Sequence, residues 1–350
     1  MDTRLYKIEY PEIDGVAIAE AAAVIRRGGL VVFPTETVYG LGADATNAGA
    51  AKAIYEAKGR PSDNPLIIHI ASPEDAAPYA ETNATYYRLA ERFMPGPLTV
   101  ILKRKQTIPT TVTGGLDTVA VRCPSHPVAR ALIAAAGVPI AAPSANRSGR
   151  PSPTLASHVI EDLWGRVDCI IDGGPSEVGL ESTIVALDGE CGTLLRPGAI
   201  TPEQLAEVIP TLTIAPAVLE ALGEHERPLS PGMKYKHYAP SAPLALLEGD
   251  AEAVAAYLLS LENREEIGVL CFDEEIGSMP EGFTLFPVGR RDRLDEQAHG
   301  FFAALREADA NPNIKRLFAH LPPREGLGLA LYNRAIRAAA HTIIHLGKPE

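Results

Sequence analysis

The sequence lacks the features that mark several classes of protein. It has four cysteines, Cys123, Cys169, Cys191 and Cys271, whose spacing does not match a zinc site, so we expect reduced thiols. No apolar run reaches the length of a membrane span. The first residues, MDTRLYKIEYPEIDG, are too polar for a secretory signal. Together these absences predict a cytoplasmic protein without a membrane anchor.

An excess of basic charge is also missing. The formal net charge is −12, which argues against an extended nucleic-acid footprint but is compatible with a local basic pocket. The chain has no Gly-x-x-x-x-Gly-Lys-Ser/Thr loop and no Gly-x-Ser-x-Gly elbow, and its C-terminal part has no dinucleotide fingerprint. A bound nucleotide would therefore be held by side chains and loop amides rather than by a Walker loop.

The 350 residues present predict two α/β domains. Residues 1–215 mix buried strands, alternating strands and amphipathic helices, which favours a mixed sheet. Residues 216–241 are rich in proline without a periodic apolar face and read as a linker, although Met233 to Tyr238 carry aromatic and cationic groups typical of ligand contact. Residues 242–350 alternate strands and helices in the rhythm of a small parallel, doubly wound sheet.

The stretch that most strongly indicates chemistry contains Lys58 and Arg60, two residues apart ahead of an apolar strand at 65–70. In an extended segment, such residues point to the same side. We therefore expect a stiff loop that presents paired positive charge to a phosphate or carboxylate. The alternative is a solvated loop with a lysine that ends a helix, and the residues alone leave both interpretations open.

Polar residues also stand at the ends of other predicted strands, where α/β folds bind ligands. The motif 34–40, PTETVYG, follows one such strand. Arg122 is the last residue of another strand, whose preceding residues are apolar and suited to the core. Each has a structural alternative: Arg122 could pair with Glu36 or Asp172, and His69 could be a core histidine.

The small-residue strand 139–142 runs into a third polar segment. Ser144 and Asn146 could bind a ligand or close turns on their own backbone, and Arg196 could bind an anion or lie on the surface. The case for a site depends on the number of cations, hydroxyls and amides that gather at strand ends.

Seven segments of the chain, in order, resemble the YrdC-like domain of threonylcarbamoyl-AMP synthases. These segments are PTETVYGLGADA, KGRPSDNPLIIHI, PGPLTVIL, TVAVRCPSHPVA, PIAAPSANRSGRPSPT, GLESTIV and LLRPGAI. The stretch SPGMKYKHYAP and the part that follows resemble the long, two-domain form of the family. The resemblance implies a YrdC-like mixed, twisted sheet with flanking helices at 1–215, a linker that forms an active-site lid at 216–241, and a Rossmann-like parallel α/β domain at 242–350.

The resemblance also implies a reaction. The family joins L-threonine, bicarbonate or CO2, and ATP to give threonylcarbamoyl-AMP and pyrophosphate. The product supplies a downstream threonylcarbamoyl transferase complex that modifies adenosine in tRNA. ATP is then a substrate, and Mg²⁺ is expected to be held mainly by ATP rather than by protein side chains. No membrane partner is implied, and direct RNA contact is left open.

Residue roles follow from the same resemblance. Lys58 and Arg60 are expected to be catalytic, as electrostatic stabilisers of phosphate charge. The residues expected to bind L-threonine are Thr35, His69, Arg122, Ala142 and Ser182. The residues expected to bind ATP are Lys58, Arg60, Asn64, Thr118, Ser144, Asn146, Ser152, Arg196 and Tyr238. The lid is expected to include Tyr235, Lys236, His237 and Tyr238, which would protect a short-lived carbamate from water.

Two other functions compete with this one. The family's single-domain relatives present a concave positive surface that suits double-stranded RNA, although the acidic balance of this chain weakens that alternative. YrdC-like domains also occur in carbamoyl-phosphate-dependent carbamoyl transfer, which would need no threonine.

Overall fold

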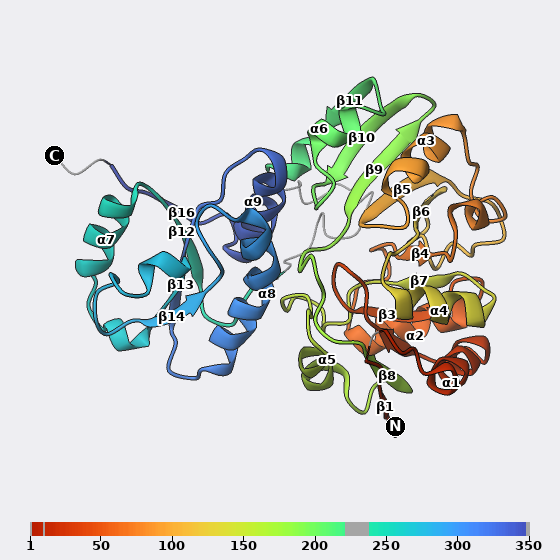
Figure 1. Cartoon of the computed structure of the whole chain (residues 1–350), viewed down its shortest axis with the longest axis horizontal. Helices are drawn as coiled ribbons and strands as arrows, with labels where there is room; N and C mark the ends of the chain where they lie inside the picture. Colours follow the sequence, from red (N-terminus) through yellow and green to blue (C-terminus); the bar gives the residue numbers. More distant parts are fainter. Residues whose placement is uncertain (1, 10, 221–237, 348–350) are drawn as a thin grey trace. The chain divides into compact units, whose positions relative to one another are not determined.

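The computed structural model describes residues 2–9, 11–220 and 238–347 and divides the chain into two compact units (Figure 1). The first unit comprises residues 1–148 and 152–235, and the second comprises 149–151 and 236–350. Within the described ranges, no helix is long and apolar enough to cross a membrane.

The first unit is built on a mixed sheet of eleven strands in the order β1-β8-β2-β3-β7-β4-β6-β5-β9-β10-β11. The strands are β1 Arg4–Lys7, β2 Val31–Phe33, β3 Gly40–Asp44, β4 Ile67–His69, β5 Leu98–Lys103, β6 Thr118–Arg122, β7 Ile140–Ala142, β8 Cys169–Asp172, β9 Thr183–Asp188, β10 Cys191–Arg196 and β11 Thr211–Ile214.

The helices of the first unit begin where the sequence supplies capping residues. Asp14, Asn47 and Asn83 each accept hydrogen bonds from the first free backbone N–H groups of a helix. The α-helices are α1 Gly15–Arg26, α2 Ala48–Lys58, α3 Ala84–Phe93, α4 Pro127–Ala136, α5 Ala156–Leu163 and α6 Pro202–Ala206, and the 3₁₀ helices are η1 Pro73–Ala76 and η2 Pro216–Val218.

The second unit has a five-stranded sheet in the order β14-β13-β15-β12-β16, with every pair parallel. Its strands are β12 Leu244–Glu248, β13 Ile267–Cys271, β14 Thr284–Pro287, β15 Arg316–His320 and β16 Ile343–His345. Its helices are α7 Ala251–Leu259, α8 Leu294–Ala310 and α9 Gly326–Ala338, with 3₁₀ helices η3 Arg264–Glu266 and η4 Asp273–Glu275. Figure 1 shows α7 on one side of this sheet and α8 and α9 on the other.

The expected fold class is confirmed, with a mixed sheet in the first unit and a small parallel sheet in the second. The sequence did not predict four strands, β1, β3, β11 and β16, which are short or poor in apolar residues.

Candidate active site in the first unit

The expected site residues that lie on strands share one face of the large sheet. His69 of β4 lies opposite Arg122 of β6, which in turn lies opposite Thr99 of β5. Because alternate residues of a strand point to the same side, the register puts several candidates on this face. They are Ala142, His69, Thr118, Arg122 and Arg196.

The opposite face of the same strands forms the main hydrophobic core, with Ile68, Val119 and Val121 fully or almost fully buried. Helices α1 and α4 cover the site face where β2, β7 and β8 lie, in a second core that includes Phe33 and Ala142. The candidates on β4, β6 and β10 lie on strands that this second core does not include. The site face of these strands also carries a smaller buried apolar cluster that includes Ile67 and Ala120, so the polar candidates lie beside this cluster rather than on an open surface.

Arg122 forms a buried ion pair with Glu36. Its Nη2 lies 2.7 Å from Glu36 Oε1, and the two side chains are 5% and 4% exposed. Within the described part of the chain, Arg122 Nε and Glu36 Oε2 have no hydrogen-bond partner. One of the two structural alternatives for Arg122 is thus correct, but the pair still leaves a buried donor and a buried acceptor unsatisfied, which is costly without a ligand.

His69 is fully buried beside Arg122 and Phe33. Its Nδ1 lies 3.2 Å from Ile67 O and 3.3 Å from Ile140 O, and its ring packs edge-on against Phe33 at 5.9 Å. Since both neighbours of Nδ1 are carbonyl oxygens, Nδ1 carries the proton and Nε2 is the acceptor. Burial, and then the charge of Arg122, lower the pKa of His69 to about 3. The imidazole is therefore a neutral hydrogen-bond acceptor at neutral pH.

Lys58 is held at the segment that follows β7. It is the last residue of α2, and its Nζ donates to Ser144 O at 2.5 Å and to Asn146 O. Ser144 Oγ in turn donates to Asn146 Oδ1 at 2.5 Å. The structure therefore brings three expected ATP-binding residues together, with a buried ammonium held by carbonyl oxygens of Ser144 and Asn146.

Arg60 does not join Lys58 on one side of an extended loop, so that expectation was wrong. The helix continues to Lys58, and Gly59 reverses the chain with φ of 62°. Arg60 Nε and Nη2 then donate to Asn64 O at 3.3 Å and Pro65 O at 3.1 Å. Lys58 ends a helix, as the alternative interpretation expected. The Arg60 side chain stabilises the loop that it belongs to.

Asn64 and Thr118 lie at the other end of the β4–β6 pair from His69 and Arg122. Thr118 and Arg122 are the two ends of β6, which separates them by roughly 13 Å at the usual strand rise. Asn64 is buried, and its Oδ1 has no hydrogen-bond partner among the described residues. The candidates thus line the site face along the whole length of these strands, as an elongated substrate would require.

Ser182 contacts the expected residue Arg196 and a residue that was not expected, Thr99. Its hydroxyl lies 2.7 Å from Thr99 Oγ1 and accepts from Arg196 Nη2 at 3.1 Å, and Arg196 Nε donates to Ser182 O at 3.0 Å. The neighbouring Glu181 accepts a hydrogen bond from Ser152. All of these side chains are buried, so they form a fixed polar wall beside Arg122.

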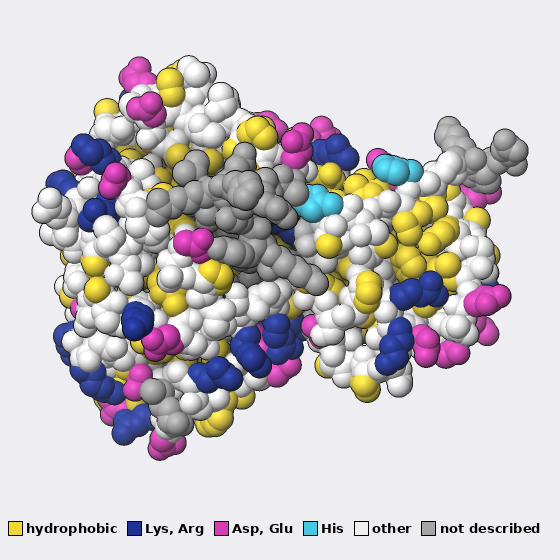
Figure 2. Space-filling model, turned by 180° about the vertical axis from the view of Figure 1, so that it is seen from behind, with side chains coloured by type: hydrophobic (Ala, Val, Ile, Leu, Met, Phe, Trp, Pro, Cys, Tyr) yellow, Lys and Arg dark blue, Asp and Glu magenta, His cyan; other side chains and the backbone are white. Residues whose placement is uncertain are grey.

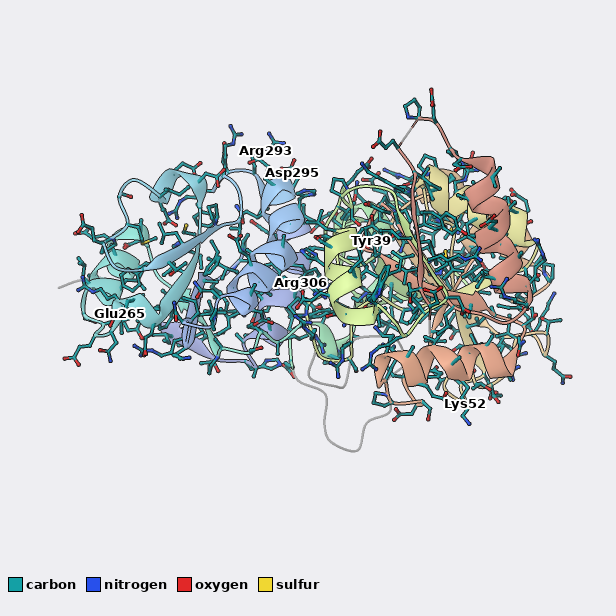
Figure 3. The ribbon with its side chains drawn as sticks, turned by 90° about the horizontal axis from the view of Figure 1, so that it is seen from below. Tyr39, Lys52, Glu265, Arg293, Asp295 and Arg306 are labelled. Carbon is teal, nitrogen blue, oxygen red and sulfur yellow. The ribbon has the colours of Figure 1, made fainter. Side chains whose placement is uncertain are left out.

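Thr35 closes a turn. Its hydroxyl donates to Val38 O at 2.6 Å and lies 2.9 Å from Thr37 Oγ1, which fixes Glu36 between the two threonines. Tyr39 follows and donates to Gly174 O at 2.6 Å, inside the first unit (Figure 3). Burial raises the pKa of Tyr39, so its phenol stays protonated and holds this loop.

Two expectations fall outside this cluster. Tyr238 belongs to the second unit, where its ring packs on Phe302 at 5.1 Å. The other proposed lid residues, Tyr235, Lys236 and His237, lie outside the described residues.

Three polar residues of the site were missed from sequence. Glu36 and Thr99 are buried beside expected residues, and Glu181 accepts from Ser152. Thr99 could have been found by its alternation, since it interrupts the apolar run of β5 as Arg122 ends that of β6. Glu36 lies inside the motif 34–40 and was considered as a partner of Arg122, but not as a residue that contacts the substrate.

The arrangement suits a substrate with several anionic oxygens. Among the described residues, no group of three or more His, Cys, Asp or Glu side chains could hold a metal ion.

Basic and acidic side chains are interspersed over the face shown in Figure 2, without an extended surface of one sign. The positive charge of the site is therefore local.

Two family models match the chain. One, described as "Telomere recombination", matches residues 23–198, and the other, described as "Threonylcarbamoyl-AMP synthase, C-terminal domain", matches residues 200–340. A threonylcarbamoyl-AMP synthase of Bacillus subtilis is 47% identical over 93% of this chain and 94% of its own length. One from Pyrococcus abyssi is 46% identical with the same coverage.

Two solved structures are similar to this chain, one over nearly its whole length and one over part of it. The crystal structure of P. abyssi Sua5 complexed with L-threonine superposes with a TM-score of 0.91 and 42% identity, over 98% of this chain and 99% of the other. E. coli YciO, at 25% identity and a TM-score of 0.51, covers 57% of this chain and 96% of its own.

Proposed function

The chain belongs to the threonylcarbamoyl-AMP synthase family, and on that premise we propose how its residues perform the reaction. The reaction joins L-threonine, bicarbonate or CO2, and ATP to give threonylcarbamoyl-AMP and pyrophosphate. The observation that carries the proposal is the buried Arg122–Glu36 pair on the site face, with one nitrogen and one oxygen left without partners in the described chain. An amino acid supplies the two groups that such a pair lacks.

L-threonine is proposed to bind across this pair. Its carboxylate would accept from Arg122, and its ammonium would donate to Glu36 Oε2. The unprotonated Nε2 of His69 and the hydroxyl of Ser182 would contact its hydroxyl, and the small Ala142 would leave room for it. Thr35 would act by holding Glu36 in place.

ATP is proposed to lie along the rest of the site face. Lys58, Arg60, Ser144 and Arg196 would contact the phosphates. Asn64, Thr118, Asn146 and Ser152 would contact the ribose, base or phosphate oxygens, and Tyr238 would complete the nucleotide site. The anchoring of Lys58 by Ser144 and Asn146 supports this placement, because it fixes the ammonium where phosphate charge would develop.

The chemistry then needs no covalent intermediate on the protein. The ammonium of bound threonine first loses a proton to solvent. The free amine then attacks the carbon of CO2, which gives a carbamate with loss of a second proton, or the carbon of bicarbonate, which gives a carbamate with loss of water. A carbamate oxygen attacks the α-phosphorus of ATP, and the bond to the β-phosphate oxygen breaks to release pyrophosphate. Lys58 and Arg60 would stabilise the charge that develops on the phosphates.

Further expectations remain proposals. Mg²⁺ is proposed to enter with the phosphate oxygens of ATP, which are ligands that this ion prefers. A downstream threonylcarbamoyl transferase complex acting on tRNA is proposed to consume the product, in the cytoplasm. The division into 1–215, a linker at 216–241 and 242–350 is proposed as the functional division.

Pyrophosphate release tests this function directly. We expect release from ATP only when L-threonine and bicarbonate are both present. ATP hydrolysis that ignores threonine would contradict the synthase reaction. Carbamoyl transfer from carbamoyl phosphate without threonine would support the competing carbamoyltransferase, and RNA binding with steep salt dependence would support an RNA-binding module.

A further inference from the structure

A cavity of about 320 Å³ lies at the carboxyl edge of the sheet in the second unit. Its walls come from the ends of three neighbouring strands, β14, β13 and β15, and from α8 and α9. The apolar residues of the wall include Leu270, Phe272, Val288, Leu294, Phe301 and Leu331. A second cavity of about 410 Å³ shares Phe272, Arg291 and His320 with the first and extends to Gly249 and Arg324.

The strand order explains why a crevice forms there. Helix α7 packs on one face of the sheet, in a core that also contains Met279 and Phe283 from the connection between β13 and β14. The helices that follow β14 and β15 lie on the opposite face (Figure 1). The chain thus leaves β13 toward one face and its two neighbours toward the other, which opens the sheet edge at a topological switch point. Ligands of open α/β sheets bind in such crevices.

A stack of charged and aromatic side chains forms one wall. The ring of His320 lies parallel to that of Phe272 at 4.6 Å, and the guanidinium of Arg291 lies over Phe272 at 4.5 Å. Glu275 contacts both the imidazole and the guanidinium, with Oε2 at 2.9 Å from His320 Nε2 and Oε1 at 2.5 Å from Arg291 Nη2. Burial acts to raise the pKa of Glu275, but His320, the Phe272 N–H and Arg291 outweigh it and lower the pKa. The wall is therefore pre-organised, with the carboxylate ionised.

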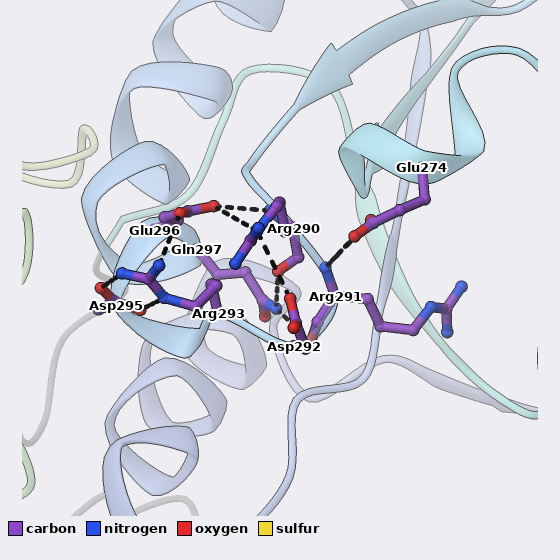
Figure 4. Close-up of polar contacts among 8 residues, drawn as sticks. All are labelled: Glu274, Arg290, Arg291, Asp292, Arg293, Asp295, Glu296 and Gln297. Atoms are coloured by element: carbon purple, nitrogen blue, oxygen red, sulfur yellow. Dashed lines mark hydrogen bonds and ion pairs between the residues drawn. The ribbon is translucent and has the colours of Figure 1, made fainter.

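The arginines of the adjacent loop differ in what they contact. Arg290 pairs with Asp292 and Glu296, and Arg293 pairs with Asp295. Arg291 turns away from this network, as Figure 4 shows, and it lines both cavities. Figure 3 shows Arg293 and Asp295 together at the start of α8. One arginine of the loop is thus directed to the cavities while its neighbours neutralise the acidic groups beside them.

Positive charge remains available at the mouth of the second cavity. Arg291 contacts Glu275 through Nη2, and within the described residues its Nη1 and Nε contact no carboxylate. Arg324 is exposed and stacks on Tyr332 at 4.7 Å, without an ion pair to any residue in the described ranges. The acidic residues that border the cavities are already paired, Asp292 with Arg290 and Glu248 with His345.

From this geometry we propose that the crevice in the second unit binds a small organic anion. The apolar body of the ligand fills the 320 Å³ cavity, and its carboxylate or phosphate group lies against Arg291 and Arg324. This site is separate from the substrate groups assigned to the first unit and does not depend on the synthase mechanism.

Phenyl phosphate and phenylacetate test the proposal, because they share a ring and differ in the anion. Ligands of this size bind with a Kd of about 1 mM, which calorimetry or ligand-observed NMR on the full chain can measure. We expect saturable binding of at least one of them and weaker binding of neutral benzyl alcohol. The preferred anion identifies the natural ligand as a carboxylate or a phosphate ester.

Matched variants localise the binding. Arg291→Gln should weaken it by about tenfold or more, since a charged hydrogen bond is lost. Arg293→Gln removes an equally exposed arginine from the same loop and should leave the Kd unchanged. Arg324→Gln, on an exposed segment, gives a second measurement if loss of the Arg291–Glu275 contact disturbs folding. No saturable binding of either probe, or equal binding by all three variants, would overturn the site.

Discussion

Arg122 Nη2 and Glu36 Oε1 lie 2.7 Å apart, while Arg122 Nε and Glu36 Oε2 are buried and have no hydrogen-bond partner among the described residues. A purely structural ion pair of two buried groups would be expected to use its remaining hydrogen-bond capacity, because unsatisfied charged groups are costly. The single contact leaves each partner able to bind an opposite charge on the same substrate.

Glu36→Gln should impair threonine binding more than turnover. The amide keeps the shape of the side chain but removes the charge that would hold the substrate ammonium. Loss of one charged hydrogen bond predicts a rise in the KM for threonine of roughly 10- to 100-fold. Glu81→Gln, which breaks an exposed pair with Lys103, is the control. An unchanged KM in the Glu36 variant would rule out this role.

Lys58→Met should reduce kcat/KM by roughly 100- to 1000-fold if its ammonium stabilises phosphate charge in the transition state. Lys52→Met is a matched control on the same helix, because Lys52 is exposed and contacts Glu56 at 3.7 Å (Figure 3). Steady-state pyrophosphate release measures both variants. Equal rates for the two would remove Lys58 from the catalytic residues.

Burial of His69 should make the free energy of unfolding depend on pH. Its folded-state pKa of about 3 lies below the value of about 6.5 in an unfolded chain. Between these values the unfolded state binds a proton that the folded state does not, so this group destabilises the fold as the pH falls below about 6.5. The loss is about 1.4 kcal/mol per pH unit.

The variant His69→Gln lacks this titration. The stability advantage of the natural chain over the variant should therefore shrink by about 1 kcal/mol between pH 6 and pH 5. Urea unfolding followed by the fluorescence of Trp164, the single tryptophan and a residue of the first unit, gives the comparison. A pH-independent difference would show that His69 is protonated in the folded state as readily as in the unfolded one.

Gly114→Ala should destabilise the loop that carries Asn64. Gly114 has φ of 59°, and an added Cβ would lie 2.7 Å from Asp63 O, a backbone atom that cannot move away cheaply. Gly59→Ala is the control, because Gly59 has φ of 62° but open space around the added Cβ. The control should cost about 1–2 kcal/mol from conformation alone, and Gly114→Ala should cost more. Similar melting temperatures would show that the 114 loop shifts to relieve the clash.

The sequence predicted most elements of both sheets because buried strands and capped helices leave local signals. Asn47 and Asn83 precede the helices they cap, and the apolar run predicted as a strand at 65–70 contains β4. The strand β3 was not predicted, since GLGAD has little side-chain volume and pairs only because its neighbours do. Local pattern cannot show a strand that long-range pairing creates.

The site was predictable in membership but not in contacts. Lys58, Ser144 and Asn146 were expected to bind the same substrate, and they lie within hydrogen-bond distance of one another. The same-side pairing of Lys58 with Arg60 failed because Gly59 takes a left-handed conformation that ends the helix there. Glu36 was one of two partners considered for Arg122, but the two residues are 86 apart in sequence, and only the tertiary structure decides between Glu36 and Asp172.

The strict alternation along β4 and β6 has a consequence for redesign. Positions 67, 69, 120 and 122 face the site, while 68, 119 and 121 face the main core. Selectivity for a different amino acid could therefore be sought at Ile67 and Ala120 without a change to the main core, but both residues also pack in the smaller apolar cluster on the site face, so a substitution there must keep that packing. Residues that face the site and residues that face the main core thus alternate along the same two strands.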